Sequence, residues 1–142
     1  GRGEWAMFFE RIPKEEYARL AERFSPERFD PGAWASLAKR AGMNYMVLTT
    51  RHHDGFCLFD SRVSDFTSTR TAAKRDFVAE YVSACRKAGL RVGLYYSLLD
   101  WRFPGYFDPK GQPESAREMV DIDKSSFLAR SPMVGPDMTH LL

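Results

Sequence analysis

Two adjacent histidines, His52 and His53, stand directly after a run of apolar residues and are followed at once by Asp54 and Gly55. A neutral imidazole offers one hydrogen-bond donor and one acceptor, so it is suited to the hydroxyl groups of a polar ligand. Asp54 would then orient a ring nitrogen or cap the next turn, and Gly55 would allow a sharp reversal of the backbone. The string therefore predicts a site that recognises hydroxyl groups.

Two other interpretations of the string stay open. A zinc ion requires three or four converging ligands, whereas neighbouring side chains of an extended segment point to opposite sides. His52 and His53 would therefore seldom share one ion, and only His140 could add a third imidazole. The string could also simply close a turn, with its polar groups satisfied by hydrogen bonds. The polar-ligand interpretation is favoured, and no metal or cofactor is assigned.

A second group of polar and aromatic residues follows the next apolar segment. Tyr95 and Tyr96 lie at its end, and Asp100 and Trp101 come shortly after it. In parallel α/β folds, ligands bind at the carboxyl ends of the strands, where both groups would lie. Because side chains alternate along a strand, only one of the two tyrosines can face such a site.

Two similar helix–strand segments are expected to position these residues. The first helix begins after Asp30, which caps it, and ends at Gly42, which is typical of a left-handed cap. A nearly all-apolar strand over 45–50 follows. The buried face of the helix is expected to have i, i+3, i+4, i+7 spacing and to consist of Trp34, Leu37, Ala38 and Ala41.

The second segment repeats this order, with Asp76 as the cap, Gly89 at the helix end and a strand over 90–97. Strands that are apolar on both faces and alternate with amphipathic helices predict an α/β fold with a parallel sheet covered by helices. Further expected elements are a short helix over 13–24, a Ser/Thr-rich loop over 61–75 and one more helix over 116–130.

Composition excludes several classes of function. The chain has 142 residues, enough for a single core, and a net charge of +2 from dispersed Lys and Arg, which argues against nucleic acid. No apolar stretch approaches the roughly 20 residues of a membrane span. The first residues do not match a signal peptide, and the sequence assigns no compartment. Cys57 and Cys85 form neither a disulfide framework nor a CxxC motif.

Three strings resemble the α-L-fucosidases of glycoside hydrolase family 29. They are "GEWAMFFERIP", "AGMNYMVLTTRHHDGFCLFDSRVSDFTS" and "KRDFVAEYVSACRKAGLRVGLYYSLLDWRFPGYF". The resemblance implies a (β/α)8 TIM-barrel catalytic domain, of which residues 1–110 would form a partial fragment with two of the eight strands. Residues 111–142 would form a divergent tail with some helix, involved in self-association.

The resemblance also implies an activity and a set of site residues. The family hydrolyses α-linked L-fucose with retention of configuration, so the partner would be a fucosylated glycan or a small α-L-fucoside. The substrate contacts of the family fall on Glu4, Trp5, His52, His53 and Tyr95 of this sequence.

The catalytic carboxylates are not assigned by the resemblance. Retaining glycosidases use two carboxyl groups about 5–5.5 Å apart. In the family, the nucleophile follows a later strand in a "WxD"-like context and the acid/base lies farther on, and neither context occurs in this chain. Glu4, Asp54 and Asp100 are therefore the candidates. Glu4 as an ordinary exposed terminal residue and Asp100 as a turn cap stay open as alternatives.

Two alternatives to an active fucosidase remain. The chain could be a fucose-binding remnant without activity, or a metal-dependent module that uses the His-His-Asp string. Two parallel strands cannot close a barrel or cover both strand edges, so a homo-oligomer is expected. The apolar strand residues expected to be exposed in a monomer are Val47, Leu48, Val92 and Leu94.

Overall fold

A computed structural model of the chain describes residues 3–103. All of them belong to the first of the two units, Gly1–Pro109 and Lys110–Leu142, into which the chain divides. The tail predicted over 111–142, its helix over 116–130 and His140 lie outside the described residues.

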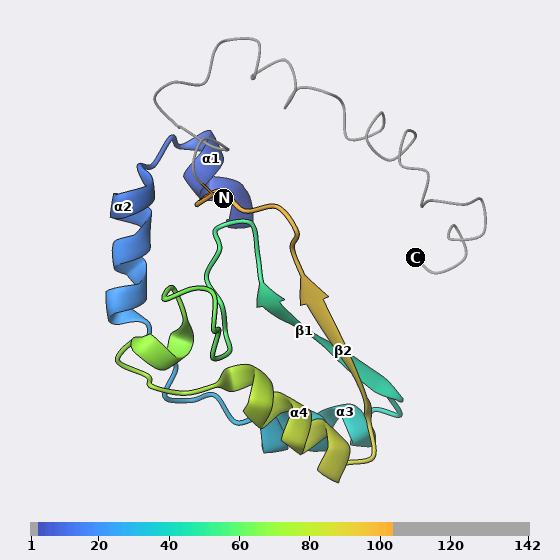
Figure 1. Ribbon diagram of the computed structural model, residues 1–142. Coiled ribbons are helices and arrows are strands. Elements are labelled where there is room, and N and C mark those ends of the chain that lie inside the picture. Colours follow the sequence, from blue (N-terminus) through green and yellow to red (C-terminus); the bar gives the residue numbers. More distant parts are fainter. Residues whose placement is uncertain (1–2, 104–142) are drawn as a thin grey trace, which may run out of the picture. The chain divides into compact units, whose positions relative to one another are not determined.

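The centre of the first unit is a parallel pair of strands, β1 (Tyr45–Arg51) and β2 (Arg91–Tyr96). Helix α3 (Pro31–Arg40) precedes β1, and helix α4 (Phe77–Lys87) precedes β2, so the chain runs helix, strand, helix, strand (Figure 1). The expected parallel α/β arrangement is thereby confirmed. The described residues form a two-stranded sheet and no closed barrel.

Both helices begin and end as their sequences predict. The carboxylates of Asp30 and Asp76 each accept a hydrogen bond from the backbone N–H three residues on, at 2.9 and 2.8 Å. Gly42 and Gly89 follow the helix ends with φ angles of 79° and 68°, a conformation that a side chain with a Cβ disfavours. Local sequence therefore determines where each strand starts.

The buried core joins the two helices to one face of the strand pair. It consists of Ala35, Ala38, Tyr81, Cys85 and Leu90, with Met46, Leu48 and Val92 packed against it. The buried face predicted for α3 was partly wrong, because Trp34 and Leu37 remain 46% and 59% exposed. Ala41, the C-cap of α3, is exposed as well. Small side chains occupy the contact instead, since alanines allow α3 to approach its neighbours closely.

The opposite face of the strand pair is not covered by these helices. Alternation places Tyr45, Val47 and Tyr95 on that face, and all three are exposed. Of the strand residues expected to be exposed, Val47 and Leu94 are so, whereas Leu48 and Val92 pack against the core.

The residues before α3 form short helical pieces. They are the 3₁₀ turn Gly3–Trp5, α1 (Ala6–Phe9), α2 (Lys14–Ala18) and the 3₁₀ segment Arg19–Arg23. The helix predicted over 13–24 is thus half α and half 3₁₀. The loop predicted over 61–75 contains one short 3₁₀ turn, Ser68–Arg70. No helix in the described part of the chain is long and apolar enough to cross a membrane.

Candidate functional site

The two imidazoles lie side by side at the end of β1. Their ring centroids are 4.0 Å apart. The prediction that they point to opposite sides was wrong, because β1 ends at Arg51 and the backbone turns at once, with the N–H of Gly55 donating to the carbonyl of His52 at 3.0 Å. Strand alternation therefore does not apply to this dipeptide.

Aromatic side chains from three segments surround the imidazoles. The ring of Trp5 meets His53 edge-on at 5.2 Å, and Trp101 lies 5.3 Å from the same imidazole. The ring of Tyr95 stacks on His52 at 5.8 Å with an interplanar angle of 21°. Four of the five predicted substrate contacts thus converge at the carboxyl ends of β1 and β2, and Trp101 joins them.

Glu4, the fifth predicted contact, is an exposed residue of the turn that also carries Trp5. Its negative charge acts on His53 and favours the protonated imidazole. Burial acts more strongly in the other direction, with help from the charges of His52 and Arg51, so the pKa of His53 is lowered from its ordinary value. The lowered pKa favours the neutral form of the His53 ring at pH 7.

Hydrogen bonds hold both the ring and the backbone of His53. Its Nδ1 lies 2.5 Å from the hydroxyl of Ser97, the residue that follows β2. Its carbonyl accepts a hydrogen bond from the backbone N–H of Trp101 at 2.8 Å. The segment after β2 thus positions the imidazole that the segment after β1 presents.

Arg51 joins these two segments. Its side chain is buried, and Nη1 donates to the carbonyl of Ser97 at 2.9 Å and to that of Leu99 at 3.3 Å. Nη2 forms an ion pair with Asp100 at 2.6 Å, and the other oxygen of Asp100 accepts from the backbone N–H of Arg102 at 2.9 Å. Both carboxylate oxygens of Asp100 therefore have partners, one in β1 and one in the loop after β2.

Asp54 closes the turn that carries the histidines. Its carboxylate accepts a hydrogen bond from the backbone N–H of Phe56 at 3.2 Å. Burial raises the pKa of Asp54, against that hydrogen bond and the nearby charges of His52 and Arg51. The phenol of Tyr17 has a raised pKa as well, first because of burial and then because of the charge on Asp54. Asp54 is thus a half-buried carboxyl group with an elevated proton affinity.

The described residues contain no group of three or more His, Cys, Asp and Glu side chains that could hold a metal ion. The ring centroids of the two imidazoles are 4.0 Å apart. A third protein ligand, which zinc sites require, does not join them within residues 3–103.

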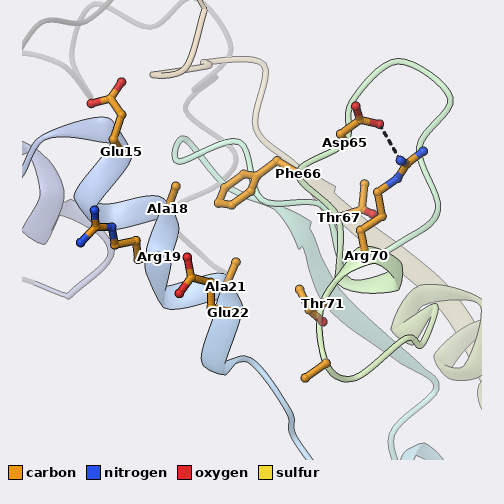
Figure 2. A pocket seen from close by; sticks show the side chains of 11 residues that line it. Glu15, Ala18, Arg19, Ala21, Glu22, Asp65, Phe66, Thr67, Arg70 and Thr71 are labelled. Carbon is orange, nitrogen blue, oxygen red and sulfur yellow. Dashed lines mark ion pairs between the residues drawn. The ribbon is translucent and has the colours of Figure 1, made fainter.

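Two cavities lined by described residues lie elsewhere on the first unit. Figure 2 shows one of about 430 Å³ between the α2 region and the loop before α4, with Glu15 and Arg19 on one side and Phe66 and Arg70 on the other. A second, of about 690 Å³, lies between α3 and α4. Neither of these two cavities is lined by a residue of the histidine cluster. The candidate site rests instead on the convergence of imidazole and aromatic rings at the strand ends.

Sequence reasoning did not single out Arg51 and Ser97. A signal for Arg51 was present, since a cation that directly follows an apolar strand must be paired if it is buried. Nothing local distinguishes Ser97 from any other serine at the end of a strand, because its role depends on a residue 44 positions away.

The family model described as alpha-L-fucosidase matches residues 5–131 of the chain. Among curated relatives, the tissue alpha-L-fucosidase of Bos taurus is 43% identical over 99 residues, which are 69% of this chain and 21% of that protein. The alpha-L-fucosidase of Dictyostelium discoideum is 33% identical over 109 residues, 76% of this chain and 24% of the relative. The chain spans about a fifth to a quarter of the length of these relatives.

Solved structures agree with these matches. Alpha-L-fucosidase isoenzyme 1 from Paenibacillus thiaminolyticus has 46% sequence identity and a TM-score of 0.72, with 84% of this chain and 31% of that chain covered. The alpha-L-fucosidase from Lactobacillus casei in complex with its alpha-L-fucose product has 46% identity and a TM-score of 0.68, with 70% and 32% covered.

Proposed function

Because the chain belongs to the α-L-fucosidase family, we propose that it takes part in the hydrolysis of α-L-fucosides with retention of configuration at the anomeric carbon. Its substrate is a fucosylated glycan or a small α-L-fucoside. The observation that supports this proposal is the convergence of Trp5, His52, His53 and Tyr95 at the carboxyl ends of two parallel strands.

The cluster suits a deoxysugar, which has both hydroxyl groups and an apolar edge. His52 and His53 supply ring nitrogens for the hydroxyl groups, and Glu4 adds a carboxylate beside them. The indole of Trp5 offers an apolar face against which the methyl edge of fucose packs. These side chains hold the sugar while charge develops at its anomeric carbon.

Retaining hydrolysis then needs two carboxyl groups in different states. One attacks the anomeric carbon as a carboxylate, while the other protonates the departing oxygen and afterwards activates water. Among the three candidates, Asp54 has the raised pKa that an acid requires, and Glu4 is the exposed carboxylate whose charge reaches His53. Asp100 fits least, because Arg51 and a backbone N–H occupy its oxygens.

The test measures binding and turnover separately on the full chain. Calorimetric titration with L-fucose should show binding, and 4-nitrophenyl α-L-fucoside should release nitrophenol. His53→Ala should weaken fucose binding about tenfold or more, since one good hydrogen bond contributes on the order of 1.4 kcal/mol.

A tyrosine pair provides the matched control. Tyr95→Ala removes the ring stacked on His52, whereas Tyr45→Ala removes an exposed ring on the same face at the other end of the strand pair. Only the first should weaken binding. Fucose binding without nitrophenol release would contradict the hydrolytic proposal, and equal losses in both tyrosine variants would contradict the location of the site.

The uncovered strand face supports a second part of the proposal, self-association. Val47 is an exposed apolar residue on that face, Leu94 is an exposed apolar residue on the other face, and among residues 3–103 each strand has one unpaired edge. Light scattering at micromolar concentration should therefore give a mass above that of one chain. A stable monomer would contradict this expectation.

A further inference from the structure

We propose that Ser97 is a positioning residue that holds His53 in the tautomer with its proton on Nδ1, so that Nε2 accepts a hydrogen bond from a ligand hydroxyl. The sugar identity of that ligand rests on the proposed function. The tautomer itself depends only on contacts within the chain.

The geometry around the Ser97 hydroxyl determines the tautomer. Its Oγ lies 2.5 Å from Nδ1 of His53 and 3.2 Å from the carbonyl oxygen of Leu99. A hydroxyl group has one proton to donate, and a carbonyl oxygen can only accept. Both hydrogen bonds form together only when the hydroxyl donates to Leu99 and accepts from an N–H at Nδ1 of His53.

Ser97 is held in place by its backbone. Its N–H donates to the carbonyl of Arg51 at 3.0 Å, and its own carbonyl accepts from the guanidinium of Arg51 at 2.9 Å. The same guanidinium donates to the carbonyl of Leu99 at 3.3 Å, so the acceptor of the serine proton is also held. The hydroxyl is buried with its residue, which keeps water from replacing either partner.

The second nitrogen of the ring is left for a ligand. Nε2 of His53 makes no hydrogen bond within the part of the chain that the structure describes. The charged groups that face the ring are His52, Glu4 and Arg51, and the neighbouring indoles of Trp5 and Trp101 are neutral. With burial, their balance favours the uncharged ring, so Nε2 carries a lone pair at neutral pH.

This arrangement fixes the direction of the hydrogen bond between His53 and a ligand. A ligand hydroxyl next to His53 must donate its proton to Nε2, and it can still accept a bond from another donor. A ligand group that can only accept hydrogen bonds would meet an unpaired lone pair, and a buried unpaired acceptor is costly. Ser97 therefore determines which hydrogen-bonding pattern the site recognises.

The first experiment is nitrogen-15 NMR of the full chain with labelled histidine at neutral pH. The His53 signals are assigned with the variant His53→Gln. We expect a pyrrole-type Nδ1 and a pyridine-type Nε2. The reverse assignment in the wild-type chain would overturn the inference without any variant or ligand.

The second experiment uses Ser97→Ala, with Ser83→Ala on the exposed side of α4 as its control. Ser97→Ala should move His53 toward the Nε2–H tautomer and weaken L-fucose binding about tenfold, whereas Ser83→Ala should change neither. Ser97→Thr keeps the hydroxyl and should restore the wild-type spectrum. An unchanged tautomer in folded Ser97→Ala would overturn the inference.

The two proposals fail in different ways. A wild-type chain with the Nδ1–H tautomer that does not bind fucose would contradict the proposed function and leave the role of Ser97 intact. Fucose binding by a wild-type chain with the Nε2–H tautomer would contradict the role of Ser97 and leave the proposed function intact.

Discussion

The two helix–strand segments begin alike and end differently. Asp30 and Asp76 cap their helices with nearly the same hydrogen bond, and Gly42 and Gly89 follow the helices in the same left-handed conformation. After β1, however, the chain turns at once and presents two imidazoles. After β2 it runs on through Ser97–Asp100 and supplies carbonyls, a hydroxyl and a carboxylate to the first segment.

This difference gives the loops after the two strands different roles in the proposed site. In the proposed site, the loop after β1 carries the two imidazoles, and the loop after β2 holds His53 in position. Arg51 connects them, because it belongs to β1 and nearly all its hydrogen bonds go to the loop after β2. Polar groups in the loop after β1 can then be half-exposed and still hydrogen-bonded, since the loop after β2 pairs with several of them.

The largest effect is expected from Arg51→Met. The side chains of Arg51 and Asp100 are 8% and 34% exposed. The change removes the cation from one oxygen of Asp100, the guanidinium donor from the carbonyl of Ser97, and one of two donors from the carbonyl of Leu99. We expect a loss of about 3 kcal/mol in the free energy of unfolding, measured by urea denaturation. Fucose binding should fall as well, because the two loops lose their connection.

The matched control for Arg51→Met is Arg70→Met. Arg70 also pairs with an aspartate, Asp65, but these side chains are 58% and 86% exposed. The expected loss is about 0.5 kcal/mol or less. Equal losses in the two variants would show that Arg51 is an ordinary surface arginine and that the loops are not connected through it.

The next largest effect is expected at Gly55, which lies in the loop after β1. Gly55 and Gly42 have φ angles of 80° and 79°, so alanine is strained at both. At Gly42 a Cβ would meet nothing within 4 Å, whereas at Gly55 it would lie 3.0 Å from atoms of both Asp100 and Arg102. We expect losses in unfolding free energy of about 1 kcal/mol for Gly42→Ala and about 2 kcal/mol for Gly55→Ala.

Denaturation curves of these two glycine variants isolate the crowding between the loops, because the backbone strain is common to both. Gly55→Ala should also reduce fucose affinity, and Gly42→Ala should not. If Gly55→Ala were as stable as Gly42→Ala, the side chains of Asp100 and Arg102 would move away from the added methyl group at no cost in stability.

The two helix caps give a smaller difference. Asp30→Ala should cost about 1 kcal/mol, the usual value of an aspartate cap. Asp76→Ala should lower the free energy of unfolding by about 1.5 kcal/mol. The loss is larger because the second oxygen of Asp76 also accepts a hydrogen bond from the backbone N–H of Asp60 at 3.1 Å. Thermal unfolding of both variants checks this order, and equal costs would mean that the Asp60 bond contributes nothing.

The repeated pattern of caps and strands could be predicted because its causes are local. An aspartate before a helix, a glycine after it and an apolar strand each depend on a few neighbouring residues. The face that α3 buries could not be predicted, since Trp34 fits the periodic pattern better than Ala35 does. The close approach of α3 and α4 decides between them, and that is a property of the tertiary packing.

The site residues that meet a ligand could be proposed from their chemistry and from the family resemblance. Their arrangement could not. The 4.0 Å between the imidazoles depends on where β1 ends, and a strand boundary cannot be placed to one residue from sequence. The contacts of Arg51 and Ser97 join positions more than forty residues apart, so no local spacing reveals them.

The smallest expected effect is a pH dependence that belongs to the loop after β1. The pKa of His53 is lowered in the folded chain, chiefly by burial, from a value near 6.5 in the unfolded chain. Between these two pKa values the unfolded chain binds more protons, so stability is fully present above about pH 6.5 and declines as the pH falls through this window.

Urea denaturation across this range should therefore show a decline for the wild-type chain that His53→Gln removes. Asp54 titrates in the opposite sense, because its raised pKa stabilises the folded chain on acidification, and Asp54→Asn separates the two contributions. If the decline below about pH 6.5 persisted in His53→Gln, the group responsible would not be the His53 imidazole that the loop after β2 holds, and the proposed division between the two loops would lose its support.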